Sequence, residues 1–314
     1  MKKIEMFVIT HRKLFLKVPE NYKIIGVGKY GKENSKTILC DSIGENIANR
    51  NANYCELTAI YWLWKNYDLP DYIGICHYRR FFVDGLKSKI YSTNKLEKIM
   101  QKYDVILPYK VKEKPDVWGY FANSISGREK DLISLEELIR KDYPDYYDYF
   151  EKVMHSRSAS FCNMMVMKKV DFKNYCSWLF ELLEKYEKMV DLEGYTKQEQ
   201  RIYGFMSEFL LNVWVEKEGK RVKYLNSMLF TENKFKNILK KYDFYLALSI
   251  CSIHKSSLIT DYLIRRCKSC KIIWFCCNYD FVIHILEFWF CKEFINIRIV
   301  VRAFHRTYNK TCVF

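Results

Sequence analysis

The stretch DYIGICHYRRFF, Asp71 to Phe82, decides how this sequence is interpreted. Its first half, Tyr72 to Cys76, has the length and the apolar composition of a buried β-strand. The residues that follow carry one imidazole, one phenol and two guanidiniums: His77, Tyr78, Arg79 and Arg80. Charged groups at the end of a buried strand need solvent or an opposite charge. The stretch therefore predicts a strand that leads into a polar site.

The chemistry of this polar cluster favours an anionic ligand. Open α/β sheets bind their ligands at the carboxyl ends of the strands. Guanidinium groups at such an edge suit a phosphate or a diphosphate. An alternative stays open, in which Arg79 and Arg80 pair with carboxylates at the surface.

The segment before this strand predicts a helix. In NANYCELTAIYWLWKN, Asn51 to Asn66, helical periodicity begins near Tyr54, and apolar side chains recur at helical spacing. Glu56 falls in the first turn, where an acid either complements the helix dipole or serves in catalysis. The helix, a short turn and the following strand form one strand-helix-strand unit, which brings the His77 to Arg80 cluster to a carboxyl strand end.

The rest of the first two thirds of the chain also alternates between strands and helices. A strand over 4–10 ends at His11 and Arg12, a second histidine beside an arginine. A long polar loop is expected over 109–130, a kind of segment that is often functional. Further strands are expected over 22–30, 103–108 and 158–167, and further helices over 94–102, 134–141, 170–190 and 195–216. This order predicts an α/β fold with a central, mostly parallel sheet.

The helix expected over 195–216 carries a second candidate site. Its polar stripe at spacings of three and four contains Gln200, Arg201, Gly204 and Glu208. A surface ion pair between Arg201 and Glu208 would explain part of this stripe. However, a glycine inside a helix costs about 1 kcal/mol relative to alanine, so Gly204 indicates close packing or a nearby ligand.

Composition narrows the function classes. The chain has 49% hydrophobic residues and a formal net charge of +15, which excludes disorder and favours polyanions, anionic lipid or phosphorylated substrates. The sequence contains no helix-turn-helix, zinc-finger or RNP-type motif, so we expect no nucleic-acid partner and keep nucleic acid only as the rival ligand. The twelve cysteines form no disulfide framework and the N-terminus resembles no signal peptide. We therefore expect reduced thiols, a cytoplasmic location and no structural metal site.

The last part of the chain, 236–314, differs in character. Residues 241–314 contain 11 Lys or Arg against 5 Asp or Glu, interleaved with aromatic residues. Its most apolar run, 272–291, is interrupted by polar and charged residues and predicts no membrane-spanning helix. We expect a mainly helical extension that rests peripherally on the anionic inner face of the plasma membrane. A small helical subdomain is the alternative.

Several motifs together resemble a known family. They are Thr10-His11-Arg12, the segments Asn51 to Asn66 and Tyr72 to Arg80, the strand Cys162 to Lys169, and the helix Arg201 to Glu208. The sequence is similar over about residues 4–230 to a bacterial family associated with capsular and exopolysaccharide synthesis. The family was long catalogued as a domain of unknown function, and its members are regarded as glycosyltransferases, some as galactofuranosyltransferases. Arg12 replaces the usual lysine, and the loop after residue 110 departs from the pattern, which leaves the choice of acceptor open.

The resemblance implies a GT-A-like nucleotide-sugar transferase domain over 1–235, with the donor held at strand ends. Such enzymes commonly hold a divalent metal with an Asp-x-Asp motif, which this chain lacks. We therefore expect a metal-independent reaction with no required cofactor, and leave Mn²⁺ or Mg²⁺ open. The residues expected to bind the donor, a UDP-sugar, are His11, Arg12, Tyr54, His77, Tyr78, Arg79 and Arg80.

The expected reaction moves a sugar, with galactofuranose as one option, to a lipid-linked saccharide acceptor. An inverting transfer needs a base that deprotonates the acceptor hydroxyl, for which Glu208 is the first candidate and Glu56 the second. The residues expected to contact the acceptor are Trp118, His155, Asn163 and Arg201. The alternative function is a non-catalytic protein that binds anions or nucleic acid with the same charges.

Overall fold

A computed structural model of the chain describes residues 3–84 and 89–232. The predicted extension over 236–314, with its expected contact to a membrane, lies outside the described residues. Within the described ranges, no helix is both long and apolar enough to cross a membrane.

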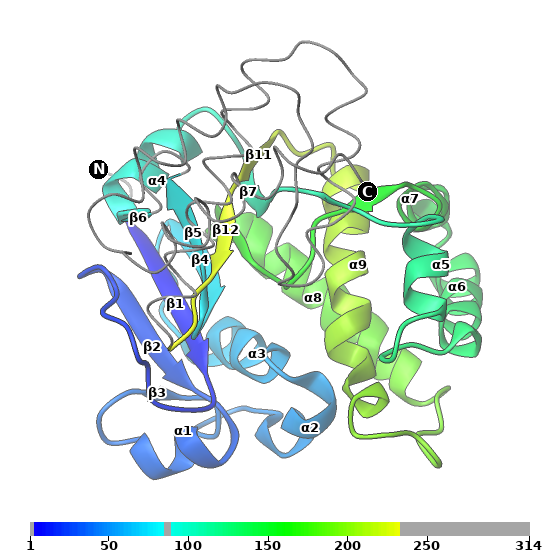
Figure 1. The fold of residues 1–314 in the computed structure, drawn as a ribbon, viewed down its shortest axis with the longest axis horizontal. Helices are drawn as coiled ribbons and strands as arrows, with labels where there is room; N and C mark the ends of the chain where they lie inside the picture. Colours follow the sequence, from blue (N-terminus) through cyan, green and yellow to red (C-terminus); the bar gives the residue numbers. More distant parts are fainter. Residues whose placement is uncertain (1–2, 85–88, 233–314) are drawn as a thin grey trace, which may run out of the picture. The chain divides into compact units, whose positions relative to one another are not determined.

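A twisted sheet forms the centre of the described part (Figure 1). Strand β1 (Ile4–Thr10) runs parallel to β2 (Tyr22–Gly26) on one side and to β4 (Tyr72–His77), the middle strand of the order, on the other. The remaining strands along this sheet are β3 (Leu39–Cys40) beside β2, β10 (Met165–Lys168) beside β4, then β7 (Val105–Pro108) and β11 (Val222–Leu225). Since β10 alone on this path is antiparallel to its neighbours, the predicted α/β fold with a mostly parallel sheet is confirmed.

Strand β4 ends in a hairpin. β4 turns back at Tyr78 and Arg79 into β5 (Arg80–Asp84), which pairs with β6 (Lys89–Ile90) and β12 (Ser227–Leu229). A separate two-stranded sheet joins β8 (Val111–Lys112) to β9 (Ser158–Ala159). The polar cluster therefore lies in a hairpin turn at the carboxyl end of β4.

The helices pack on both faces of the sheet and against one another. They are α1 (Gly28–Asn34), α2 (Asn51–Tyr54), α3 (Leu57–Asn66), α4 (Thr93–Met100), α5 (Val117–Ala122), α6 (Glu129–Asp142), α7 (Pro144–Met154), α8 (Lys169–Glu187) and α9 (Ile202–Lys217). Short 3-10 turns span Ala48–Arg50 and Glu199–Arg201. Helix α9 packs against both α8 and α7, and α6 packs on α7 (Figure 1).

Strand alternation divides the core between the two faces of the sheet. Phe7 and Ile9 of β1 face the larger cluster, with α3, α8 and α9, whereas Met6 and Val8 face the smaller cluster, with α4 and β5. Gly74 of β4 lies opposite Met6, and a Cβ there would be 1.9 Å from the Met6 sulfur. Any larger residue at the centre of the motif Tyr72 to Cys76 would displace the Met6 side chain.

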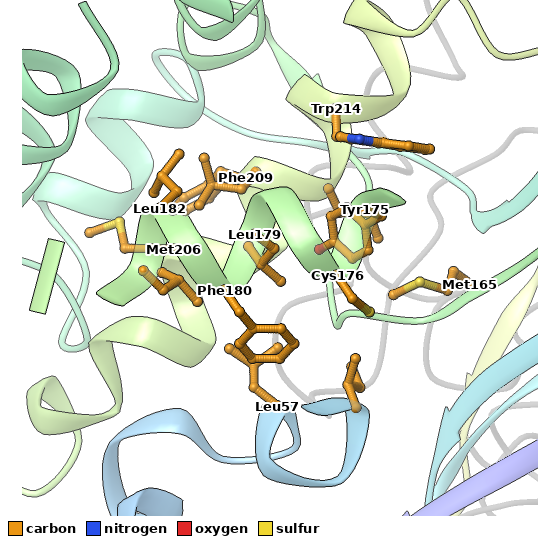
Figure 2. Close-up of a cluster of buried hydrophobic side chains, with 14 of the residues drawn as sticks. Leu57, Met165, Tyr175, Cys176, Leu179, Phe180, Leu182, Met206, Phe209 and Trp214 are labelled. Carbon is orange, nitrogen blue, oxygen red and sulfur yellow. The ribbon is translucent and has the colours of Figure 1, made fainter. Parts of the chain in front are cut away.

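The larger cluster confirms the apolar face expected for the helix over 170–190. Figure 2 shows this face of α8 packed against α9, with α3 below. The labelled side chains include Tyr175, Cys176, Leu179 and Leu182 of α8, Met206, Phe209 and Trp214 of α9, and Leu57 of α3. This packing fixes α9 relative to the sheet, and α9 carries Glu208.

Four predicted elements differ from the observed ones. The expected loop over 109–130 contains β8, α5 and the start of α6, because Asp116 caps α5 by accepting from the Gly119 N–H at 2.8 Å. The expected strand over 22–30 stops at Gly26, since α1 begins at Gly28. The helix expected from residue 195 begins at Ile202. The expected strand over 158–167 is divided by a turn at residues 160–164.

Candidate active site

A cavity of about 430 Å³ lies where β1 and β4 end and α3 and α9 approach. It is lined by the carboxyl ends of two parallel strands, by α2 and the break between α2 and α3, and by one face of α9. Its lining residues are Ile9, Thr10, His11, Val27, Asn51, Ala52, Cys55, Glu56, His77, Tyr78, Arg79, Arg80, Cys162, Arg201, Gly204, Phe205, Glu208 and Leu229. Three groups that the sequence suggested separately therefore meet in one place: His11, the cluster His77 to Arg80, and three members of the polar stripe, Arg201, Gly204 and Glu208.

Two arginines of the cavity contact sulfur atoms. Arg80 donates to Sγ of Cys162, and Nε of Arg201 donates to Sγ of Cys55 at 3.2 Å. Burial raises the pKa of Cys55 to about 11 and that of Cys162 to about 12, so both thiols are neutral near pH 7. A neutral acceptor fixes a guanidinium without cancelling its charge.

The positive charge of the cavity is therefore available to a ligand. In the described part of the chain, no carboxylate lies within ion-pair distance of Arg79, Arg80 or Arg201. The alternative that Arg79 and Arg80 pair with surface carboxylates is not observed there. Arg12, by contrast, forms an ion pair with Glu232 and does not line the cavity.

An aromatic and cationic group forms the rim beside β1. The rings of His11 and Tyr78 meet edge to face, with centroids 4.7 Å apart, and the guanidiniums of Arg12 and Arg79 each lie 5.3 Å from the Tyr78 ring. Burial, together with the charges of Arg12, Arg79 and Arg201, lowers the pKa of His11. These causes favour the neutral form of the His11 imidazole.

Two carboxylates face these cations. Burial, and then the charge of Glu56, raise the pKa of Glu208 to about 7, although the Cys162 N–H, Arg80 and Arg201 act in the opposite direction. Glu56 accepts a hydrogen bond from the Asn163 amide at 2.7 Å. A carboxyl group that titrates near pH 7 is suited to general acid or base catalysis.

The glycine in the α9 stripe has a packing reason. A Cβ at Gly204 would lie 3.3 Å from both Cβ and Sγ of Cys55. Helix α9 can therefore approach the break between α2 and α3 closely, which places Glu208 in the same cavity as Glu56. The helix predicted from Tyr54 is interrupted here, because Cys55 has φ +53°.

Several predicted site residues lie elsewhere. Tyr54 is buried in the core and donates to Glu187 at 3.0 Å. Trp118 and His155 do not line the cavity; they stack on each other with centroids 5.7 Å apart, beside Asp116. Asn163 is only 1% exposed and lies behind Glu56.

Sequence reasoning missed Cys55, Cys162 and Asn51 as lining residues. Both cysteines stand within the quoted motifs, but a cysteine in an apolar setting carries no signal for a hydrogen bond to arginine. Across the described ranges, the non-glycine residues with positive φ are Cys55, Cys162 and Asn163. Unusual backbone of this kind gathers at functional sites, and here each instance contacts the cavity or a carboxylate in it.

No group of three or more His, Cys, Asp or Glu side chains suited to a metal ion occurs in the part of the chain that the structure describes. The expectation of a metal-independent reaction stays a prediction.

Comparison with known proteins gives one solved structure and one family. The fold is similar to that of WbbM, described as a bifunctional glycosyltransferase in its apo structure, with a TM-score of 0.65 and 24% identity. The match covers 73% of this chain but 45% of that one, so the chain spans less than half of the WbbM structure's length. No curated protein matches. Residues 5–221 match the family described as "Domain of unknown function (DUF4422)", and the chain therefore belongs to this family.

Proposed function

We propose that this protein is a glycosyltransferase that moves a sugar from a nucleoside diphosphate to a saccharide acceptor. The observation that carries the proposal is the cavity, in which Arg79, Arg80 and Arg201 have no ion-pair partner among the described residues and face Glu208. The fold shared with WbbM, a bifunctional glycosyltransferase, supports the same reaction class.

The cations suit the leaving group. In the transfer, the bond between the anomeric carbon and the diphosphate oxygen breaks, and the diphosphate leaves with the electron pair. Fixed guanidiniums stabilise the charge that develops there, as preorganised donors do in a site that excludes water. Arg80 and Arg201, held on the neutral thiols, are the fixed members of this set, whereas Arg79 is exposed at the hairpin turn. We thus assign Arg201 to the donor diphosphate, in place of the acceptor contact expected from the sequence.

The carboxylates suit the acceptor. The acceptor hydroxyl oxygen forms the new bond to the anomeric carbon, and its proton must go to a base if the transfer inverts that carbon. We assign this role to Glu208, whose pKa near 7 lets it accept a proton at neutral pH. Glu56 stays the second candidate.

We propose further that the donor is a UDP-sugar, that galactofuranose is among the sugars to test, and that the acceptor is a lipid-linked saccharide. The basic and aromatic composition of residues 236–314 supports peripheral contact with an anionic membrane at its cytoplasmic face. We also propose that the cationic cluster makes a divalent metal unnecessary.

A thermal-shift assay with uridine diphosphate, followed by a transfer screen over a panel of nucleotide sugars, tests the proposal. Uridine diphosphate should raise the melting temperature, and at least one nucleotide sugar should be hydrolysed or transferred. Binding of DNA or RNA that weakens steeply with salt, without nucleotide protection, would instead support the non-catalytic alternative. Activity that vanishes in EDTA and returns with Mn²⁺ would contradict the metal-independent mechanism.

A further inference from the structure

The turn between β9 and β10 contacts four cavity residues from two consecutive positions. Cys162 accepts from Arg80 with its sulfur and from His77 with its carbonyl oxygen, and its N–H donates to the Glu208 carboxylate. Asn163 donates from its side-chain amide to Glu56. Both the cationic and the acidic side of the cavity are therefore tied to one turn.

The backbone of this turn is unusual. Cys162 has φ +82° and Asn163 has φ +47°, values that L-residues seldom adopt. Two successive left-handed residues bend the chain sharply, so that the N–H, the carbonyl and both side chains reach groups at the cavity. Asparagine is one of the few non-glycine residues that tolerate this region.

Asn163 can affect the site through its hydrogen bonds, without contacting a substrate. It is buried, and its amide nitrogen lies 2.7 Å from Oε1 of Glu56, 2.8 Å from Oγ of Ser207 and 3.1 Å from the carbonyl oxygen of Gly204. Ser207 itself donates to that carbonyl at 2.7 Å. If the amide were removed, Gly204 would keep a donor, whereas Glu56 would lose the hydrogen bond that orients it.

We propose that the Cys162–Asn163 turn is the positioning element of the transfer site, and that Asn163 acts through Glu56. This inference rests on the proposed glycosyl transfer. Glu56 in turn acts on Glu208 through its charge, while Arg80, Arg201 and the Cys162 N–H act on Glu208 with the opposite sign. Cys55, Cys162 and Tyr120 are the other titratable groups that interact with Glu208. Asn163 therefore helps to set the protonation of the base without contacting it.

The substitution that isolates the amide is Asn163→Gly, because glycine adopts positive φ without strain and keeps the turn. We expect the turnover number to fall on the order of 10²-fold, as for a misplaced catalytic group, with the affinity for uridine diphosphate within about twofold of wild type. Asn123→Gly is the matched control, since its amide also donates to a backbone carbonyl, that of Gly119, but lies outside the cavity lining.

A double-mutant cycle with Glu56→Ala, which removes the acceptor of the Asn163 amide, separates a positioning role from a structural one. If Asn163 acts through Glu56, Asn163→Gly should cause no further loss of turnover in the Glu56→Ala background. If the two substitutions instead lower the turnover number by independent factors that multiply in the double mutant, the proposal is wrong. If Asn163→Gly fails to fold, Asn163→Ala removes the same N–H donors without placing a second charge beside Glu56, and enters the same cycle.

A crystal structure of the Asn163→Gly protein gives a readout that needs no activity. We expect the Glu56 side chain to leave its wild-type rotamer, and an unchanged Glu56 would overturn the inference whatever the reaction is. A wild-type protein that transfers no sugar from any nucleotide would instead refute the proposed function. The two failures are thus distinguishable.

Discussion

Replacing Glu208 by glutamine should make the protein more stable at alkaline pH while it removes the proposed base. Burial, and secondarily the charge of Glu56, disfavour the ionised form of Glu208 and raise its pKa from 4.5 to about 7. At high pH the folded state must therefore contain an ionised carboxylate in an unfavourable environment, whereas a glutamine at this position carries no charge at any pH.

The magnitude follows from the two pKa values. A group whose pKa is higher in the folded state contributes stability that is fully present below its unfolded pKa, here near 4.5, and is lost as the pH rises through its folded pKa, here about 7. At 1.36 kcal/mol for each pH unit between these values, wild type loses about 3 kcal/mol between pH 4 and pH 8 through this one group. The free energy of unfolding of Glu208→Gln should not fall in this way, because a glutamine side chain does not ionise.

Urea denaturation at pH 4 and pH 8 measures the effect. The difference in free energy of unfolding between Glu208→Gln and wild type should grow by about 3 kcal/mol from the lower to the higher pH, and any constant cost of the amide cancels in this comparison. Glu137→Gln, at an exposed position of α6, should show no such growth. If the two variants show the same pH dependence, the pKa of Glu208 is not raised in the folded state, and the reason for assigning it the role of base is removed. Turnover of Glu208→Gln should fall by at least about 10²-fold.

The remaining predictions concern the neighbours of Glu208. Glu56→Gln removes the negative charge that raises the pKa of Glu208, so the acidic limb of the pH profile of kcat/KM should move to lower pH; a shift to higher pH would contradict the assigned coupling. Arg201→Ala should weaken binding of uridine diphosphate roughly ten- to a hundredfold by isothermal titration, the range expected for a lost charge-assisted hydrogen bond, and unchanged binding would remove Arg201 from the clamp. Cys55→Ser keeps an acceptor for Arg201 and should bind within about threefold of wild type, whereas Cys55→Ala should bind more weakly, because the guanidinium loses its fixed partner.

Much of the fold and part of the site could be predicted from sequence. Parallel strands bring their carboxyl ends to one edge, so His11 after β1 and His77 at the end of β4 had to lie near each other. Helical spacing likewise placed Gly204 and Glu208 on one side of α9, and both line the cavity. The first conclusion depends on the parallel pairing of two strands, and the second on helical periodicity within one element.

What could not be predicted depends on contacts between distant residues. Arg201 meets Cys55 across 146 positions of the chain, and Arg80 meets Cys162 across 82. No local pattern indicates a guanidinium on a thiol. Tyr54 illustrates the opposite error, since it stands in a motif that includes cavity residues but points into the core, toward Glu187.

The thiols that hold Arg80 and Arg201 also determine how the site meets reactive chemicals. Thiolate, not thiol, attacks electrophiles and peroxide. With pKa values of about 11 and 12, Cys55 and Cys162 are ionised in roughly one molecule in 10⁴ or fewer at pH 7. A cavity that contains two cysteines is therefore a poor target for covalent inhibitors, and mild oxidants should leave its arginines free to bind a diphosphate.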